Sequence, residues 1–436
     1  MARNISNPTS RRQFTKWLLG GTGLAALATG LPAAFLRAPL AFAQASPETC
    51  TAGAARFLIL CSSSNGDPVN ANCPGSYEHA AIVHPPGEEF VATPLQLGAT
   101  ATRAARLWTQ LPPSALNRAC FIHHATRTVV HPDMPKVLRL MGATNDGEML
   151  PSLLAAQLAP CLDTIQSRPV SVGKVALTAR GAPLQTLLPT ALKQLLVRAN
   201  SPLTNLRSLR DRKLDEIHGV LKREGTTEQR RYLDAAVKSR SDTRKLGDDA
   251  AELLSSITGD GPDNQVVAAI GLIRLGVTPV VSVTLPFGSD NHTDEGLQTE
   301  AEEHPLGIAA IARMTTLLEQ YGLQDRVTFA LLNVFGRTLV RKGLSGRDHW
   351  PRHAVSLLIG SGVKAGVVGG LVPFEDDFSA VGIDSASGRA VESGADIPYE
   401  ETLSSVGKTI GAAVGVTGPA LDEAIESGKV ISAALV

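Results

Sequence analysis

The sequence predicts an α/β fold in which a mostly parallel β-sheet is flanked by helices. Short apolar runs of strand length alternate with longer segments whose apolar residues recur at helical spacing. Glycine, proline, asparagine or aspartate follows many of the apolar runs, and this alternation is typical of a parallel sheet covered on both faces. The 436 residues, 43% of them hydrophobic, suffice for one large domain after any targeting segment is removed.

The individual elements follow from these patterns. We expect strands at residues 56–61, 119–122, 170–172, 278–285, 327–334 and 355–359. We expect helices at residues 100–111, 133–141, 150–162, 184–198, 264–275, 302–321 and 400–414. Residues 371–398 are predicted to form a loop.

Residues 205–257 differ in character from the rest of the chain. Charges of both signs are dense there, and apolar residues such as Leu209, Leu214 and Ile217 recur at helical spacing. This pattern predicts a helical insertion of one or two exposed amphipathic helices, which could act as a lid. An ordinary solvated helical hairpin is the alternative.

The first 43 residues resemble a twin-arginine export signal. Arg11 and Arg12 precede an apolar, glycine-rich run over residues 17–36, and Ala41-Phe42-Ala43 offers a cleavage site. The predicted mature chain is therefore a single domain over residues 44–436, located in the periplasm or outside the cell. The twin-arginine translocase would be a partner during export, and an uncleaved membrane anchor is the alternative.

Composition limits the possible partners. The formal net charge is zero and 19% of residues are charged, so no basic surface is predicted that would bind nucleic acid. Five cysteines in an exported chain leave at least one unpaired. One disulfide near the mature N-terminus is plausible, with its partners open, while Cys61 and Cys120 lie in apolar runs expected to be buried.

A stretch with the chemistry of a metal site runs from residue 343 to 353. Asp348 and His349 are adjacent in a glycine-containing turn, and carboxylates and imidazoles are common ligands of divalent metals. A helical turn beginning at Pro351 would place His353 on the same face as His349. A polar surface loop with solvated histidines is the alternative.

The stretch at 343–353 follows the strand expected at 327–334, and two further segments with possible metal ligands also follow expected strands. Asp67 comes after the first strand, and Asp290 and His292 come after the strand at 278–285. A fourth segment, residues 123–131, carries histidines after another strand. Because the carboxyl ends of parallel strands share one edge of a sheet, these groups could meet there. They would supply ligands for one or two divalent metals (Zn, Mn, Ca or Mg), and paired metals about 3.5–4 Å apart serve phosphoryl or sulfuryl transfer.

These motifs resemble a known family. The Gly-Asp after the first strand, Asp290-x-His292, the Phe-Gly-Arg-Thr at 335–338 and Gly346-x-Asp348-His349 are similar to an uncharacterised branch of the alkaline phosphatase and sulfatase superfamily. That twin-arginine-exported branch is known mainly as a domain of unknown function. The resemblance covers most of the mature chain and is clearest over residues 286–370. It implies phosphate or sulfate ester hydrolysis, with metal ligands carried onto Asp67, Asp290, His292, Asp348, His349 and His353.

The chain departs from this branch at several positions. Asn65 stands where a glycine is expected, Pro68 replaces another glycine, and Asn333-Val334 replaces Ser-Glu. Ser289 replaces a tryptophan. These departures favour an alternative hypothesis, in which the chain keeps the fold as a non-catalytic binding or assembly module.

The nucleophile is left open. No cysteine begins the pattern that sulfatases need for their aldehyde, which disfavours a standard sulfatase. Thr126 and Thr128 have the expected place in strand order, although threonine at such positions more often caps a following segment. Arg127 and Arg337 are candidates to bind a tetrahedral anion, or to form ordinary salt bridges.

The leading hypothesis from sequence is therefore an exported metal-dependent hydrolase of phosphate or sulfate esters. Its substrate would be an anionic ester, either a small molecule or part of an envelope glycan or lipid. Serine-hydrolase elbows, the His-Glu-x-x-His motif, Walker loops and dinucleotide-binding fingerprints are absent from the sequence.

Overall fold

The computed structural model describes residues 49–51, 53–196, 203–224, 226, 230, 251–288, 290–340 and 345–436. The predicted export signal, Ser289 and part of the predicted helical insertion lie outside these residues. Within the insertion, α7 (Leu203–Glu224) is described and is helical, as expected there.

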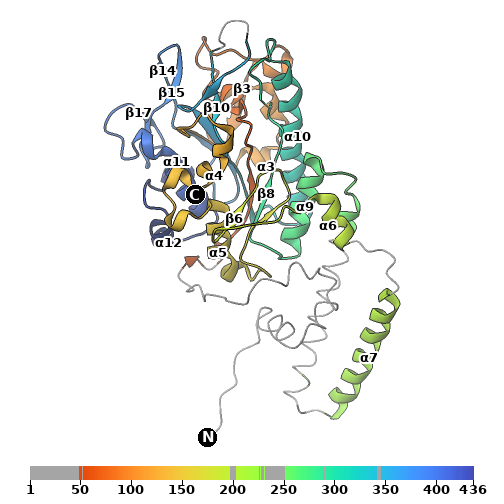
Figure 1. Ribbon diagram of the computed structural model, residues 1–436. Helices are drawn as coiled ribbons and strands as arrows, with labels where there is room; N and C mark the ends of the chain where they lie inside the picture. Colours follow the sequence, from red (N-terminus) through yellow and green to blue (C-terminus); the bar gives the residue numbers. More distant parts are fainter. Residues whose placement is uncertain are drawn as a thin grey trace.

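A seven-stranded sheet forms the centre of the protein (Figure 1). Its strands, in spatial order, are β13 (Gly366–Val368), β4 (Ala119–His124), β12 (Ala354–Ile359), β9 (Val327–Leu331), β1 (Phe57–Cys61), β8 (Val280–Val283) and β5 (Val170–Ser171). β1 pairs in parallel with β8 and β9, β5 with β8, and β13 with β4. Only β12 runs against its neighbours β4 and β9. The predicted α/β fold with a mostly parallel sheet is confirmed.

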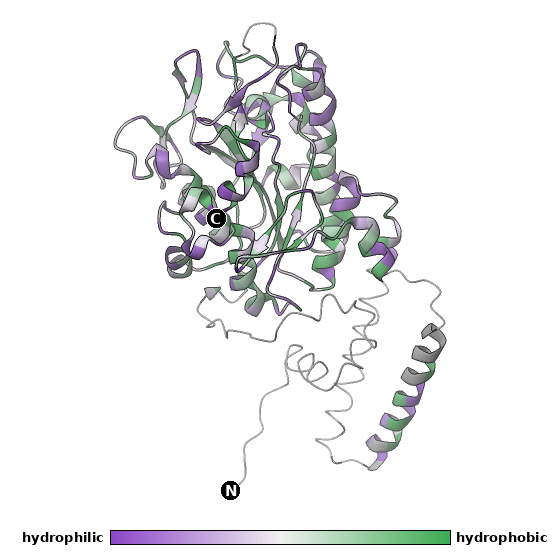
Figure 2. Cartoon of the chain, in the orientation of Figure 1, coloured by the Kyte–Doolittle hydropathy of each residue, from purple (hydrophilic) through white to green (hydrophobic). Residues whose placement is uncertain are grey.

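The sheet is buried on both faces, and most positions of its strands are apolar. Along β1, Phe57 and Ile59 pack into the hydrophobic cluster that contains residues of α9 (Pro262–Arg274) and α10 (Gln298–Gln320). Leu58 and Leu60 point the other way, into the cluster with α5 (Leu150–Leu162) and α11 (Thr402–Ala413). Figure 2 shows hydrophobic residues concentrated in these central strands. Continuous apolar strands of this kind are typical of parallel sheets covered by helices.

Shorter elements complete the fold. The other α-helices in the described part of the chain are α2 (Val69–Asn72), α3 (Pro113–Leu116), α4 (Met134–Leu138), α6 (Pro189–Leu196) and α12 (Gly418–Ala424). Single 3₁₀ turns lie at Glu88–Phe90, Arg106–Gln110, His131–Asp133, Leu140–Gly142, Asn145–Gly147, Tyr399–Glu401 and Ser432–Ala434. Two-stranded antiparallel sheets pair β6 (Thr178–Ala179) with β7 (Ala182–Pro183), and β10 (Gly336–Arg337) with β11 (His349–Trp350).

Three local predictions were wrong. The helix expected at 100–111 is β3 (Thr100–Ala105) followed by the 3₁₀ turn at Arg106–Gln110. β3 pairs with β2 (Ala92–Leu97) through a tight turn where Gly98 adopts a positive φ of 55°. The loop expected at 371–398 contains two hairpins, β14 (Leu371–Phe374) with β15 (Asp377–Ala380) and β16 (Gly382–Ile383) with β17 (Ala390–Val391). The helical turn expected after Pro351 is absent, and a bend at residues 351–352 leads into β12 instead.

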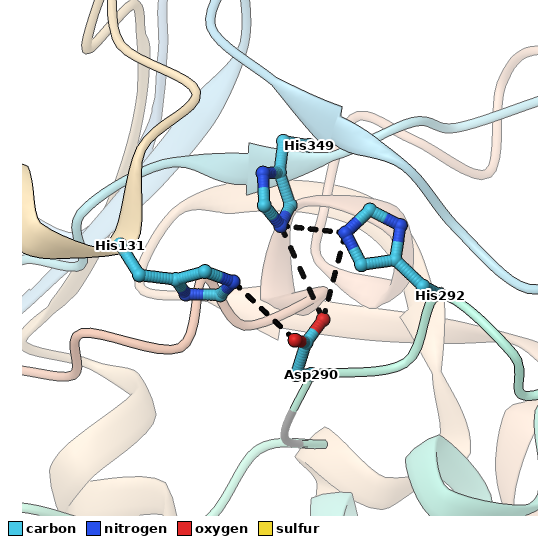
Figure 3. Close-up of side chains that lie close together, drawn as sticks. All are labelled: His131, Asp290, His292 and His349. Atoms are coloured by element: carbon cyan, nitrogen blue, oxygen red, sulfur yellow. Dashed lines mark hydrogen bonds and ion pairs between the residues drawn. The ribbon is translucent and has the colours of Figure 1, made fainter.

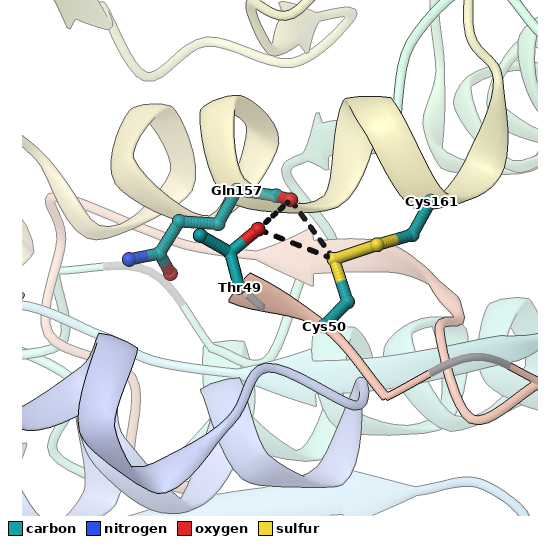
Figure 4. The surroundings of a disulfide bond; sticks show 4 residues. All are labelled: Thr49, Cys50, Gln157 and Cys161. Carbon is teal, nitrogen blue, oxygen red and sulfur yellow. Dashed lines mark hydrogen bonds between the residues drawn. A yellow bond between two sulfur atoms is a disulfide. The ribbon is translucent and has the colours of Figure 1, made fainter. Parts of the chain in front are cut away.

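A disulfide ties the N-terminal end of the described chain to the body of the fold. It joins Cys50 to Cys161 near the end of α5, and Thr49 adds a hydrogen bond from its hydroxyl to the carbonyl of Gln157 (Figure 4). Cys61, Cys73 and Cys120 are buried thiols. Among the helices that the structure describes, none has the length and hydrophobicity needed to cross a bilayer.

Candidate metal centre

The sheet topology brings several polar loops to one edge. β1, β4, β8 and β9 run in the same direction, so the loops that follow them leave the sheet at a common edge. β12 runs the opposite way and begins at that edge, so the segment that precedes it, residues 345–353, lies there as well. The antiparallel β12 therefore adds a ligand-bearing segment that a purely parallel sheet would not place here.

Four side chains converge at this edge (Figure 3). His131, Asp290, His292 and His349 each offer one ligand atom, and these atoms all lie within 4.8 Å of one another. The Nε2 atom of His131 is 3.4 Å from Oδ2 of Asp290, and Oδ1 of Asp290 is 3.6 Å from His292 Nε2 and 4.0 Å from His349 Nε2. A tetrahedral zinc ion with Zn–N distances of about 2.0–2.1 Å has ligand atoms roughly 3.3 Å apart. All three of these separations are longer than that value, the shortest of them only slightly.

Backbone carbonyls orient two of the three imidazoles. Nδ1 of His131 is 2.7 Å from the carbonyl oxygen of Ser64, and Nδ1 of His349 is 2.6 Å from that of Val129. A carbonyl only accepts, so Nδ1 donates in both rings and the lone pair of each neutral ring is on Nε2, which faces the cluster. Metal-binding histidines usually carry such a support on the second ring nitrogen.

A carboxylate orients the third imidazole. Nδ1 of His292 lies 3.1 Å from Oδ1 of Asp348, which leaves Nε2 of His292 facing Nε2 of His349 at 2.7 Å. If both rings are neutral, two nitrogen lone pairs oppose each other at this distance. A shared cation, either a proton or a metal ion, removes that repulsion. The donor set therefore fits a divalent metal.

The charges and the burial around the cluster favour an ionised Asp290 and a neutral His349, the protonation states that bind a cation. Partial burial alone would raise the pKa of Asp290, but the Arg337 guanidinium 3.0 Å away and the histidines around it lower that pKa below its ordinary value. Burial lowers the pKa of His349, which favours the neutral ligand form. The Asp290 side chain is 51% exposed, so the cluster is accessible to solvent.

Asp67, predicted as a ligand, lies outside the four-residue cluster. Its carboxyl is buried behind the first loop, where one oxygen accepts a hydrogen bond from Ser63 at 3.3 Å and the other has no partner among the described residues. Burial raises the pKa of Asp67 to about 7. Arg337 separates this region from the cluster, since it donates to the carbonyls of Asn65 and Gly66 as well as to Asp290.

His353 also lies outside the cluster. Because the chain from His349 to β12 is not helical, the two histidines do not share a helical face. His353 is fully buried, with Nε2 2.9 Å from Nδ1 of His123 and Nδ1 3.2 Å from the side-chain nitrogen of Asn70. Burial holds the pKa of His353 well below its ordinary value. Asp348 occupies an intermediate position, since it contacts the cluster only through His292.

The hydroxyls predicted as nucleophiles have other environments. Thr128 donates to Oδ2 of Asp133 at 2.7 Å and accepts from the backbone N–H of Val130, so its hydroxyl stabilises a local turn rather than capping a helix. Thr126 is buried, and its hydroxyl has no partner among the described residues. Arg127 adopts a positive φ of 62° and lines a small pocket with residues near Glu400, away from the cluster.

His131 was not predicted as a ligand. It lies seven residues past the end of β4, in the 3₁₀ turn His131–Asp133, and no short spacing links it to another histidine or carboxylate of the site. The available signal was its place in a loop that follows a strand ending at the same edge of the sheet. That signal marked the segment 123–131 as a whole without selecting the ligand.

Comparison with known proteins gives one family match. Residues 196–381, fewer than half of the chain, match the family described as "Protein of unknown function (DUF1501)". Asp290, His292 and His349 lie inside the matched segment and His131 lies outside it. No curated protein matches the chain. The match supports a domain of unknown function and assigns no activity.

Proposed function

We propose that this chain is an exported metal-dependent hydrolase of phosphate or sulfate esters. The observation that carries the proposal is the convergence of three imidazole Nε2 atoms and the Asp290 carboxylate at the strand edge. Three imidazoles with one carboxylate favour zinc or a similar transition ion over calcium or magnesium, which prefer oxygen ligands. Four ligand atoms within 4.8 Å of one another favour one ion rather than two.

The surroundings of the cluster suit an anionic ester. When bound, a divalent ion supplies Lewis acidity to the ester and acidifies water. Asp290 is about half exposed, so a substrate can reach the cluster from solvent. Arg337 is fully buried and donates to Asp290 and three backbone carbonyls, so we assign it to holding Asp290 rather than to binding substrate.

Water is the nucleophile that this arrangement favours. Thr128 is hydrogen-bonded to Asp133, and Thr126 is completely buried, so neither hydroxyl faces the cluster as an attacking group would. In the proposed reaction the oxygen of water bonds to phosphorus or sulfur. The bond from phosphorus or sulfur to the ester oxygen breaks, and the alcohol leaves with a proton that comes from the attacking water.

Export to the periplasm or cell exterior belongs to the same proposal. The twin-arginine pattern at residues 10–16 and the disulfide between Cys50 and Cys161 both support it, because structural disulfides persist mainly in oxidising compartments.

The test is turnover of p-nitrophenyl phosphate and p-nitrophenyl sulfate by residues 44–436 loaded with zinc. We expect hydrolysis of at least one ester, lost on chelation and reduced at least 100-fold in His349→Ala, a loss typical of removing a metal ligand. Asp325→Ala, which removes an exposed carboxylate paired with Arg118, is the matched control and should keep wild-type activity. Equal hydrolysis by His349→Ala would refute the assignment.

A non-catalytic binding or assembly module is the second candidate. It is favoured by the same environments of Thr126 and Thr128, and by Asn333-Val334 where the related branch has Ser-Glu. Binding of an unhydrolysed phosphate or sulfate ester to the metal-loaded wild type, without turnover under any metal, would support this alternative.

A further inference from the structure

We propose that a buried ion pair, Glu300 with Arg347, is a positioning device that sets the spacing of the two ligand-bearing loops and so the metal affinity. The loops are residues 290–292, which carry Asp290 and His292, and residues 345–349, which carry His349. This inference rests on the metal centre of the proposed function. Glu300 and Arg347 themselves lie outside the cluster and would not touch the metal.

Glu300 is a carboxylate with its hydrogen-bonding capacity filled. It lies on α10 and is fully buried. Its oxygens accept from Nε and Nη2 of Arg347 at 2.7 and 3.2 Å, from Nδ2 of Asn72 at 2.5 Å, and from Nδ2 of Asn291 at 3.2 Å. An ionised carboxylate offers about four acceptor sites, and all four are used.

Arg347 also uses all of its hydrogen-bond donors. It is fully buried, and Nη1 donates to the carbonyls of Thr338 and Leu339 at 2.9 and 3.2 Å. Nη2 donates to the carbonyl of Val83 as well as to Glu300. A guanidinium has five N–H donors, and each has an acceptor here. Neither partner can therefore turn away without leaving a buried polar group unsatisfied.

Both members of the pair connect directly to the ligand loops. Asn291, which donates to Glu300, stands between Asp290 and His292. Arg347 stands one residue before Asp348 and two before His349. The backbone joins the loops as well, because the N–H of Arg347 donates to the carbonyl of Asn291 at 3.1 Å.

A glycine allows the loops to approach this closely. The N–H of Gly346 donates to the carbonyl of His292 at 2.8 Å, and a Cβ at Gly346 would collide with the carbonyl oxygen of Asn291. The two loops are therefore in direct backbone contact, and the ion pair between Glu300 and Arg347 joins them through buried side chains.

Metal binding is sensitive to this arrangement because ligand atoms must be held to within about 0.5 Å of the productive geometry. Removal of one partner from a buried ion pair leaves an uncompensated charge, which the surrounding structure must shift to solvate. The groups that would shift here are Asn291 and the 345–349 loop, and each carries or adjoins a ligand. The pair should therefore act on metal affinity beyond its effect on overall stability.

The test compares zinc affinity, by competition with a chromophoric chelator, in wild type and Glu300→Gln. The substitution keeps the shape but places a donor against Arg347 or Asn291. We expect zinc binding about 10- to 100-fold weaker, the usual effect of losing outer support of a metal site. We also expect an altered visible spectrum of the cobalt-substituted protein, which a general loss of stability would not change.

Lys408→Met is the matched control. Lys408 lies on α11 and is a buried cation, and its Nζ atom is 2.6 Å from Oδ1 of Asp422 on α12. Among the described residues it forms no hydrogen bond or ion pair with either ligand loop. It should lower the melting temperature of the metal-free protein while leaving the zinc affinity and the cobalt spectrum unchanged.

A second variant keeps the inference testable if Glu300→Gln fails to fold. Asn291→Ala removes the side-chain hydrogen bond between Glu300 and the 290–292 loop and leaves the ion pair intact, and it should weaken zinc binding about tenfold. Wild-type affinity and an unchanged cobalt spectrum in a folded Glu300→Gln or Asn291→Ala would overturn the inference alone. Absence of zinc binding by wild type would instead overturn the proposed function, and this inference with it.

Discussion

Asp348 distinguishes two accounts of the metal centre. The family resemblance implies that Asp348 is a metal ligand, whereas in the structure it accepts a hydrogen bond from Nδ1 of His292 at 3.1 Å and lies outside the four-residue cluster. We predict that Asp348→Ala weakens zinc binding only moderately, while His349→Ala removes a ligand and weakens it far more.

The magnitudes follow from the geometry. Loss of a carboxylate that supports a metal-binding histidine typically costs 10- to 100-fold in affinity. Asp348 and His292 are 52% and 38% exposed, so solvent screens their interaction, and we expect the low end, about tenfold or 1.4 kcal/mol. Structural zinc sites contribute about 10–16 kcal/mol over four ligands, so loss of His349 should cost roughly 3 kcal/mol, or more than 100-fold.

The assay is zinc competition with a chromophoric chelator at pH 7.5, with Asp325→Ala as the control for removing one surface carboxylate. Equal losses in Asp348→Ala and His349→Ala would refute the reasoning and make Asp348 a direct ligand. An affinity equal to wild type in Asp348→Ala would show that its hydrogen bond to His292 contributes nothing.

Three further predictions concern the frame around the site. In chelator, Asp67→Asn should become progressively more stable than wild type as pH rises from 5 to 7, by on the order of 3 kcal/mol in urea unfolding. Burial raises the folded pKa of Asp67 to about 7, above its unfolded value of 3.8, so the wild-type protein loses unfolding free energy as pH rises through this range, whereas asparagine does not titrate. A difference in unfolding free energy between the two proteins that does not change with pH would contradict this. Cys50→Ser, measured against reduced wild type and oxidised wild type, should cost about 2–5 kcal/mol of unfolding free energy, because the bridge to Cys161 closes a loop across a sequence separation of 111; a variant as stable as the oxidised protein would count against it. Gly346→Ala should weaken zinc at least tenfold by forcing its loop away from Asn291, and unchanged affinity would show that the loops can separate freely.

The sheet was predictable because its strands are short, mostly apolar runs, and the segments between several of them show helical periodicity. The direction of β12 was not predictable, because the apolar pattern of a buried strand does not show whether the strand runs parallel or antiparallel to its neighbours. That direction decides where His349 lies, because it starts β12 at the edge where the other strands end. The expected convergence at this edge was therefore correct for Asp290, His292 and His349, although one of the strands involved runs opposite to the expectation.

The errors at the site have local causes. The four-residue spacing of His349 and His353 suggested a shared helical face, but the chain there is not helical, and His353 contacts His123 instead. Nothing in the sequence distinguished Glu300 and Arg347 from surface charges. Each is buried because the other neutralises it, and a contact across 47 residues leaves no local pattern.

The most direct test of the account is the metal content of residues 44–436 purified without chelator, measured by elemental mass spectrometry beside His131→Ala. His131 is the member of the four-residue cluster that none of the family motifs contains. We predict close to one equivalent of a transition ion, zinc foremost, in wild type and almost none in His131→Ala. Equal metal in both proteins, or none in wild type after reloading with zinc, would contradict the proposed centre.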